Sequence, residues 1–174
     1  MNEFRIRLAE SSDLVAISSI EDDSFQEPYP PFLIERLLHE SRQSFFVSTI
    51  RSGKVIGYCV STVNERSAHL LSIAVLRRYR RKGIGRALLQ ALLTNLEAHD
   101  VDQVQLEVKV HNEEAIALYI KLGFARDTII ENYYPDGSAA LKMHLSLEKT
   151  GLASHLQLEG DDLHEMSFLP AGHQ

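Results

Sequence analysis

The hydrophobic positions of this chain follow two periods, a twofold alternation and a helical spacing of three or four residues. Strands are expected at residues 4–8, 44–50, 55–63, 68–75, 104–110, 125–132 and 139–147. In the fifth of these, apolar Val104, Leu106 and Val108 alternate with polar residues, so one face of the strand is apolar and the other polar. Glu107 lies on the polar face.

The helical spacing predicts four helices. They are expected from the cap residues 11–13 to about Ile20, and at 32–39, 84–98 and 113–122. The third carries Ile84, Leu88 and Leu92 on one face, as a helix that packs on a core does. The fourth can be capped by Asn112 and stops at Gly123. The order β-α-α-β-β-β-α-β-α-β-β predicts an α/β fold with a sheet of mixed direction.

Composition narrows the class of protein. The chain has 174 residues and 44% hydrophobic content, which suits one globular domain, expected at residues 1–147. Residues 148–174 lose periodicity and are expected to form a flexible tail. The net charge of −6 argues against a general nucleic-acid binder, and no apolar run approaches the roughly 18 residues that span a bilayer. A single cysteine fits a reducing compartment, so we expect a cytoplasmic protein. The expected oligomeric state is a monomer or a homodimer.

A basic, glycine-bearing turn joins the fourth expected strand to the third helix. It runs from Arg77 to Arg86 and contains Gly83 and Gly85. Glycines let the main chain approach a ligand, and the positive end of a helix dipole favours an anion. The turn therefore predicts a site for a phosphate-bearing ligand. A nucleic-acid patch is the weaker alternative, because one short basic cluster on an acidic chain lacks the interleaved aromatic residues of such patches.

Three blocks of the sequence resemble one family. The pattern Arg80-x-x-Gly83-x-Gly85 is similar to the acyl-CoA pyrophosphate motif of the GNAT superfamily of N-acetyltransferases. The blocks 106–124 and 132–137 resemble the RimI-like and archaeal amino-terminal acetyltransferases. The resemblance covers residues 3–147 and implies the GNAT fold, acetyl-CoA as cosubstrate and no metal. It also implies acetylation of protein or peptide N-termini, with ribosomal proteins among the candidate substrates.

The resemblance further implies which residues hold the cosubstrate. They are Ile73, Val75, Arg80, Arg81, Lys82, Gly83, Ile84, Gly85, Arg86, Asn112 and Tyr119. Ile73 and Val75 would use backbone groups to hold the pantetheine, and residues 81–86 would contribute amides around the pyrophosphate. Asn112 has two compatible roles, as a helix cap and as a contact to the pantetheine arm.

Acetyl transfer needs a neutral amine and a proton for the departing thiolate. An α-amine has a reference pKa near 7.7–8.0, so roughly a tenth is neutral at pH 7 and an amino-terminal substrate asks little of a base. The resemblance implies Glu107 as the base and Tyr119 as the acid. From the residues alone, Glu107 could be a solvated strand carboxylate and Tyr119 a packing aromatic. His69 is either a proton relay or a structural histidine.

By the same resemblance, two segments line a pocket for the first residue of the substrate. The proline-rich loop after the first helix supplies Phe25, Glu27 and Tyr29, and the closing hairpin supplies Tyr133 and Tyr134. Prolines stiffen the loop, which suits a preformed pocket. The alternative is that the loop and the hairpin only pack over the edge of the sheet.

Two other functions stay open. The chain could acetylate lysine side chains or a small-molecule amine, or it could be a non-catalytic acyl-CoA-binding module. Cys59 lies on an expected strand and is a poor nucleophile. Direct attack of the amine in a ternary complex is therefore expected, without a covalent acetyl-enzyme.

Overall fold

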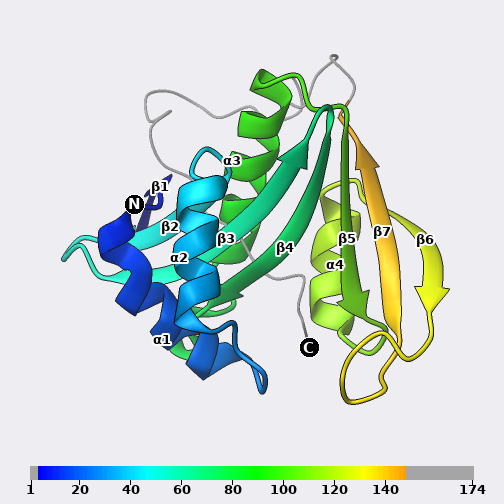
Figure 1. Ribbon diagram of the computed structural model, residues 1–174, viewed down its shortest axis with the longest axis horizontal. Helices are drawn as coiled ribbons and strands as arrows, with labels where there is room; N and C mark the ends of the chain where they lie inside the picture. The colour runs from blue at the N-terminus through cyan, green and yellow to red at the C-terminus, as the bar shows by residue number, and fades with distance from the viewer. Residues whose placement is uncertain (1–3, 148–174) are drawn as a thin grey trace.

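The computed structural model describes residues 4–147, which form one sheet and its covering helices (Figure 1). The strands are β1 (Phe4–Leu8), β2 (Phe45–Ile50), β3 (Val55–Asn64), β4 (Ser67–Val75), β5 (Gln103–Lys109), β6 (Ala125–Ile130) and β7 (Ala140–Ser146). The helices are α1 (Leu14–Ser24), α2 (Pro31–Glu40), α3 (Ile84–Ala98) and α4 (Glu113–Lys121), with short 3-10 turns at Ser11–Asp13 and Arg77–Tyr79. The predicted order of elements is confirmed.

The sheet has seven strands in the order β1-β2-β3-β4-β5-β7-β6. Neighbouring strands within residues 4–147 are antiparallel except β4 and β5, which are parallel. The crossover helix α3 connects these two strands. This confirms the predicted mixed, mostly antiparallel sheet. The expected tail at 148–174 lies outside the described residues. None of the described helices is long and apolar enough to cross a membrane.

Helices cover both faces of the sheet (Figure 1). On one face, Ile17 of α1 and Leu37 of α2 pack with Tyr58 of β3. On the other face, Leu88 of α3 and Ile116 of α4 belong to a larger apolar cluster with the inner residues of β4, β5 and β7. The helical spacing that predicted α3 therefore reflects a stripe buried against the sheet.

The sheet splits between β4 and β5. The two strands pair only at Ser67–Gln103, Ala68–Val104 and His69–Gln105, and beyond that point they diverge (Figure 1). A shift in the β3–β4 register next to Ser61 leaves Leu71 as an extra residue on β4. Such a bulge bends and twists its strand. The bulge lies two residues beyond the last β4–β5 pair, so it accounts for the place where the strands part.

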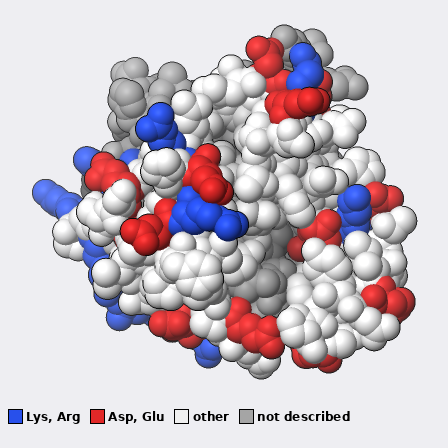
Figure 2. All heavy atoms as spheres, in the orientation of Figure 1, with Lys and Arg blue, Asp and Glu red and all other residues white. Residues whose placement is uncertain are grey.

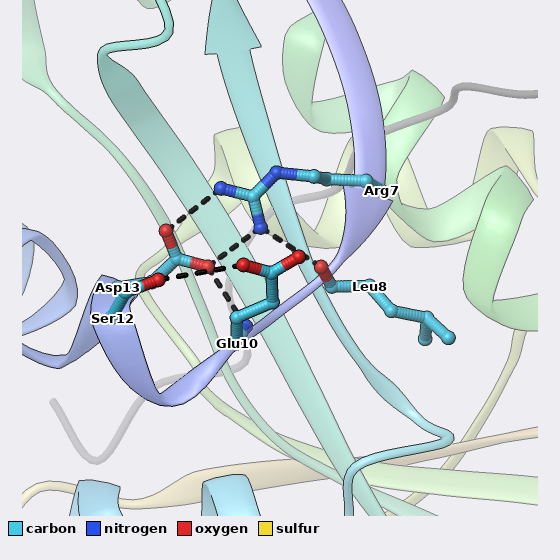
Figure 3. Close-up of polar contacts among 5 residues, drawn as sticks. All are labelled: Arg7, Leu8, Glu10, Ser12 and Asp13. Carbon is cyan, nitrogen blue, oxygen red and sulfur yellow. Dashed lines mark hydrogen bonds and ion pairs between the residues drawn. The ribbon is translucent and has the colours of Figure 1, made fainter.

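The start of α1 is fixed by a buried carboxylate. Both oxygens of Asp13 accept hydrogen bonds from the guanidinium of Arg7, at 2.7 and 2.8 Å, and one of them also accepts from the backbone N–H of Glu10 at 2.8 Å (Figure 3). The bidentate geometry orients the chain as it leaves β1 and enters the helix. Residues 11–13 form a 3-10 turn before α1.

The predicted end of α1 was wrong by four residues, because the helix continues from Ile20 to Ser24. Glu21, the first residue beyond the predicted end, is fully buried on the apolar side of the helix. Helical spacing from Ile17 places Glu21 on that side. Its carboxylate is satisfied by hydrogen bonds from other elements, so the helix does not need to end there.

Candidate active site

His69 and Glu107 face each other at the point where β4 and β5 part. The Nε2 atom of His69 lies 2.5 Å from Oε2 of Glu107. Leu106 belongs to the cluster under α3 and α4, so the alternation of β5 turns Glu107 to the opposite face of the sheet. Its side chain is only 12% exposed, whereas that of His69 is 35% exposed. The predicted polar face of β5 is therefore a half-buried surface inside the split.

The pKa of Glu107 is held below its ordinary value. The main cause is the hydrogen bond from His69, and a hydrogen bond from the Tyr133 hydroxyl and the charge of Lys142 act in the same direction. Burial opposes them, with a smaller effect than the His69 hydrogen bond. Glu107 is thus a carboxylate with one oxygen facing an imidazole that can carry a proton.

Three tyrosines from two separate segments interact with this pair or with one another: Tyr133 hydrogen-bonds Glu107, Tyr134 interacts electrostatically with Glu107, and Tyr29 with Tyr133. The ring of Tyr133 lies edge-on to that of Tyr134, with centroids 5.0 Å apart. The pKa of Tyr29 is raised to about 12, mainly by burial and then by electrostatic interaction with Glu21 and Tyr133. The pKa of Tyr134 is raised mainly by burial and then by electrostatic interaction with Tyr133, Glu107 and Tyr29. The structure therefore brings together most of the predicted acceptor residues.

An ion pair of Lys109 links β5 to the closing hairpin. Lys109 was not among the residues predicted from the sequence. Its ammonium group bonds the carboxylate of Asp136 and lies 5.4 Å from the centre of the Tyr134 ring. Asp136 also accepts hydrogen bonds from the backbone and hydroxyl of Ser138, at 2.9 and 2.6 Å. The predicted turn at 135–137 is present between β6 and β7, and Lys109 fixes its position over the site.

Tyr119 is fully buried in α4, with its ring 5.6 Å from that of Phe124. Burial raises its pKa well above the ordinary value, and nearby Tyr134 and Cys59 add to this. The hydroxyl therefore keeps its proton at neutral pH and can serve as a donor. At the start of the same helix, Oδ1 of Asn112 accepts a hydrogen bond from the backbone N–H of Ala115 at 3.2 Å, which confirms the predicted cap.

The basic turn ends in a helix start that has no side-chain cap. Gly83 is the N-cap residue of α3 and has a left-handed backbone, with φ of +77°. Arg81 is left-handed as well, with φ of +63°. A Cβ atom at Gly83 would find no atom within 4 Å other than those of Gly83 and its two chain neighbours. The first N–H groups of α3 therefore lie beside open space, an arrangement that suits a phosphate-bearing anion.

The arginine side chains around this turn bind other parts of the protein. The Nε of Arg80 donates to the carbonyl of Val75 at 2.9 Å, and its terminal nitrogen lies 3.3 Å from the hydroxyl of Ser24. The guanidinium of Arg81 pairs with the exposed Glu114 at 3.2 Å. Arg80 therefore links the turn to β4 and to the end of α1, whereas the Arg81–Glu114 pair lies on the surface with both side chains mostly exposed. A ligand contact of the Arg80 side chain remains a prediction.

A model of the acetyltransferase (GNAT) family matches residues 14–124 of the chain. The chain belongs to this family. It is 38% identical over 154 residues to an N-alpha-acetyltransferase of Sulfurisphaera tokodaii, covering 81% of this chain and 92% of that protein. It is 37% identical over 126 residues to the ribosomal protein bS18 alanine N-acetyltransferase of Escherichia coli, covering 72% and 84%.

Solved structures agree with this GNAT assignment. The crystal structure of Ard1 from Thermoplasma volcanium superposes with a TM-score of 0.80 at 35% identity, covering 84% of this chain and 99% of that one. The ribosomal-protein-S18-alanine N-acetyltransferase from Escherichia coli superposes with a TM-score of 0.78 at 35% identity, covering 86% and 97%. The split sheet with its uncapped helix start is therefore a GNAT fold.

The sequence contains both basic and acidic residues, and both kinds lie on the surface of this GNAT protein (Figure 2). On the face in Figure 2, which α1 and α2 cover, basic and acidic side chains are interspersed. The surface is hollowed between the half that carries α1 and α2 and the half that carries β6 and β7. Residues 4–147 contain no cluster of three or more His, Cys, Asp or Glu side chains that could hold a metal ion.

Two of the predicted acceptor residues differ from the three tyrosines in their exposure and packing. Glu27 is exposed on the α1–α2 loop, and Phe25 is half-buried against the apolar cluster under α1 and α2. Glu21, which was not predicted, has its carboxylate buried beneath this loop and accepts the N–H of Tyr29 at 2.6 Å. Its position one turn after Ile17, on the apolar stripe of the helix, is the signal in the sequence that could have identified Glu21.

Proposed function

We propose that this protein transfers the acetyl group of acetyl-CoA to the α-amine of protein or peptide N-termini, by direct attack in a ternary complex. The observation that carries the proposal is the His69–Glu107 pair at the split of the sheet, with Tyr29, Tyr133 and Tyr134 around it. The names of the relatives, an N-alpha-acetyltransferase and a bS18-alanine acetyltransferase, support this acceptor. Ribosomal proteins are candidate substrates on the same ground.

The cosubstrate side of the site is proposed to run from β4 to the start of α3. Acetyl-CoA would supply the acetyl group as a thioester. The amides of residues 81–86 would hold its pyrophosphate, because the first turn of α3 is uncapped and Gly83 leaves room beside it. Ile73 and Val75 lie on the part of β4 that no longer pairs with β5, so the backbone groups of Ile73 and the N–H of Val75 are the ones proposed to hold a ligand in the split, whereas the Val75 carbonyl accepts from Nε of Arg80.

Glu107 is the proposed general base. Its depressed pKa keeps the carboxylate charged, and His69 holds it in place, so it can take a proton from the α-ammonium group, directly or through one water. Because an α-amine has a reference pKa of about 7.7–8.0, this base need not be strong. The imidazole of His69 is placed to pass the proton on to solvent, since about a third of its side chain is exposed.

Tyr119 is the proposed general acid. Its buried hydroxyl keeps a proton at neutral pH, so it can donate a hydrogen bond to the sulfur as the thioester breaks and supply the proton that the departing thiolate takes up. Tyr29, Tyr133 and Tyr134 are proposed to contact the first residues of the peptide, with Glu27 at the exposed rim and Phe25 as a packed wall.

Acetyl-CoA turnover with a panel of peptides tests the proposal. The peptides differ only at the first residue, and each is also made with a blocked α-amine and an internal lysine. We expect thioester cleavage with free N-termini and none with the blocked set. Turnover of the blocked peptides would assign the enzyme to lysine side chains, and CoA binding without any turnover would assign a non-catalytic module.

A further inference from the structure

Glu21 is the most deeply buried carboxylate among the described residues, with no exposed surface. Glutamate is almost never fully buried unless its charge has partners. Glu21 lies on the last turns of α1, on the side of the helix that packs against the central strands. An apolar side chain there would also fit the apolar spacing of the helix. A buried charge at such a position calls for a specific reason.

The carboxylate of Glu21 joins three separate elements. Its Oε2 atom accepts the backbone N–H of Tyr29, on the α1–α2 loop, at 2.6 Å. Its Oε1 atom accepts the hydroxyl of Tyr58 on β3. Ser72 of β4 completes the cluster, with its Oγ 2.6 Å from the Tyr58 oxygen and 3.4 Å from Oε1. The hydrogen bonds from the Tyr29 N–H and the Tyr58 hydroxyl thus end on the two oxygens of one carboxylate.

The loop that Glu21 holds is also fixed at its start. The N–H of Phe25 donates to the carbonyl of Glu21 at 2.9 Å, which ends α1. Asp23 accepts the backbone N–H of Arg77 at 3.0 Å, and the carbonyl of Asp23 accepts Nε of Arg77 at 2.9 Å. The loop is therefore tied to the basic turn before Phe25 and to the buried carboxylate at Tyr29.

We propose that Glu21 is a positioning residue that holds Tyr29 and the α1–α2 loop in the conformation that receives the first residue of the acceptor. The proposal rests on the proposed function for the identity of the acceptor. Glu21 touches no reacting group, and it acts through the N–H of Tyr29, a residue of the proposed acceptor pocket. Loss of the carboxylate should loosen the acceptor pocket and leave the cosubstrate side intact.

Glu21→Gln tests this with little change in shape. The amide nitrogen cannot accept a hydrogen bond, so it would face either the Tyr29 N–H or the Tyr58 hydroxyl as a second donor. We expect KM for the peptide to rise about tenfold or more, with kcat at saturating peptide and KM for acetyl-CoA nearly unchanged. Asp22→Asn is the matched control, because Asp22 is exposed on the same helix and the charge change is the same.

A second readout does not depend on the reaction. Hydrogen exchange of the Tyr29 amide should be faster in Glu21→Gln than in the wild type, whereas exchange in α3 should not change. If the wild type acetylates no peptide N-terminus, the proposed function fails, and the exchange measurement still decides the role of Glu21. Unchanged exchange at Tyr29, or equal losses for peptide and acetyl-CoA, would overturn the proposal.

Tyr58→Phe keeps the proposal testable if Glu21→Gln does not fold. This variant removes one hydroxyl and retains the carboxylate and the aromatic packing against Phe45. It should move the peptide KM and the Tyr29 exchange rate in the same direction as Glu21→Gln, by a smaller factor. A loss of thermal stability without either change would show that the cluster only stabilises the core.

Discussion

The two sides of the proposed site are built in different ways. The cosubstrate side is one continuous stretch, from the end of β4 through the basic turn to the start of α3, and it presents backbone amides. The acceptor side is assembled from side chains on the α1–α2 loop, β4, β5 and the β6–β7 hairpin. Its members are up to 109 residues apart in sequence, as Phe25 and Tyr134 show.

This difference has consequences for substitution. A site made of amides depends on the backbone conformation, so it tolerates side-chain changes except where a left-handed residue must be glycine. A site made of side chains depends on each functional group and on the contacts that hold it. Substitutions that remove a single functional group should therefore impair the acceptor side. Substitutions that restrict the backbone conformation should impair the cosubstrate side.

The largest expected effect comes from Glu107→Gln. Glutamine keeps the shape of the side chain and a hydrogen bond to His69, but it cannot take up the proton of the amine. We expect kcat/KM for a peptide to fall by about 10²–10⁴-fold, with acetyl-CoA affinity retained in a calorimetric titration. Glu35→Gln, at an exposed position of α2, is the control. Full activity of Glu107→Gln would remove Glu107 from the mechanism.

The pH profile sharpens the assignment of the base. The His69 hydrogen bond depresses the pKa of Glu107, so the carboxylate stays charged as the pH falls below its ordinary pKa. The acid limb of wild-type kcat/KM should then follow the α-amine of the peptide, near its reference pKa of about 7.7–8.0. A peptide whose α-amine is less basic should move the limb to lower pH. A limb that ignores the peptide belongs to an enzyme group such as His69.

Tyr119→Phe should have the next largest effect. The substitution leaves the packing against Phe124 in place and removes a hydroxyl that burial keeps protonated. We expect kcat to fall about 10²-fold with KM for acetyl-CoA unchanged. An acetyl thioester with a more acidic thiol needs less help from an acid, so the loss should be smaller with that donor. Equal losses with both donors would argue for a structural role of Tyr119.

Gly83→Ala should weaken the cosubstrate side through the backbone. Its φ of +77° is unfavourable for alanine, and the new methyl group would stand beside the first amides of α3. We expect KM for acetyl-CoA to rise about tenfold, equivalent to about 1.4 kcal/mol, with the peptide KM unchanged. Gly53→Ala is the matched control, because Gly53 has φ of +81°, an equally open Cβ position and a place in the distant β2–β3 turn. Equal effects of the two variants on KM would contradict the assignment.

The same difference explains how much the sequence could predict. Local patterns were sufficient for the order of the elements, the basic turn and the Asn112 cap, because each depends on residues close in the chain. They also placed Glu107 on the polar face of β5, since alternation along a strand is local. The side chains that the resemblance assigned to the acceptor pocket lie near one another for the most part, and their roles remain predictions.

What the sequence could not predict depends on contacts between distant segments. The extra residue Leu71 arises from the pairing of β4 with β3, and it sets where the sheet opens. The predicted helix ended at Ile20, so Glu21 was not selected. Its burial depends on hydrogen-bond donors from Tyr58 and Tyr29, which lie on other elements. Arg80 matched a ligand-binding motif, which remains a prediction, but the motif could not show that its Nε donates to the carbonyl of Val75. In each case the deciding partner lies on another element or on the far side of a turn.

Arg81→Gly should have the smallest effect and is the sharpest test of amides against side chains. Arg81 has φ of +63°, which glycine adopts without strain, so the variant keeps the backbone and removes the guanidinium. That guanidinium pairs with Glu114 on the surface, where both side chains are mostly exposed. We expect KM for acetyl-CoA to stay within about twofold, because exposed ion pairs contribute little. The dependence of this KM on salt should also match the wild type, since no phosphate contact has been lost. A large rise in KM together with a weaker salt dependence would show that the arginine side chain binds the phosphates, and the two sides of the site would then be built alike.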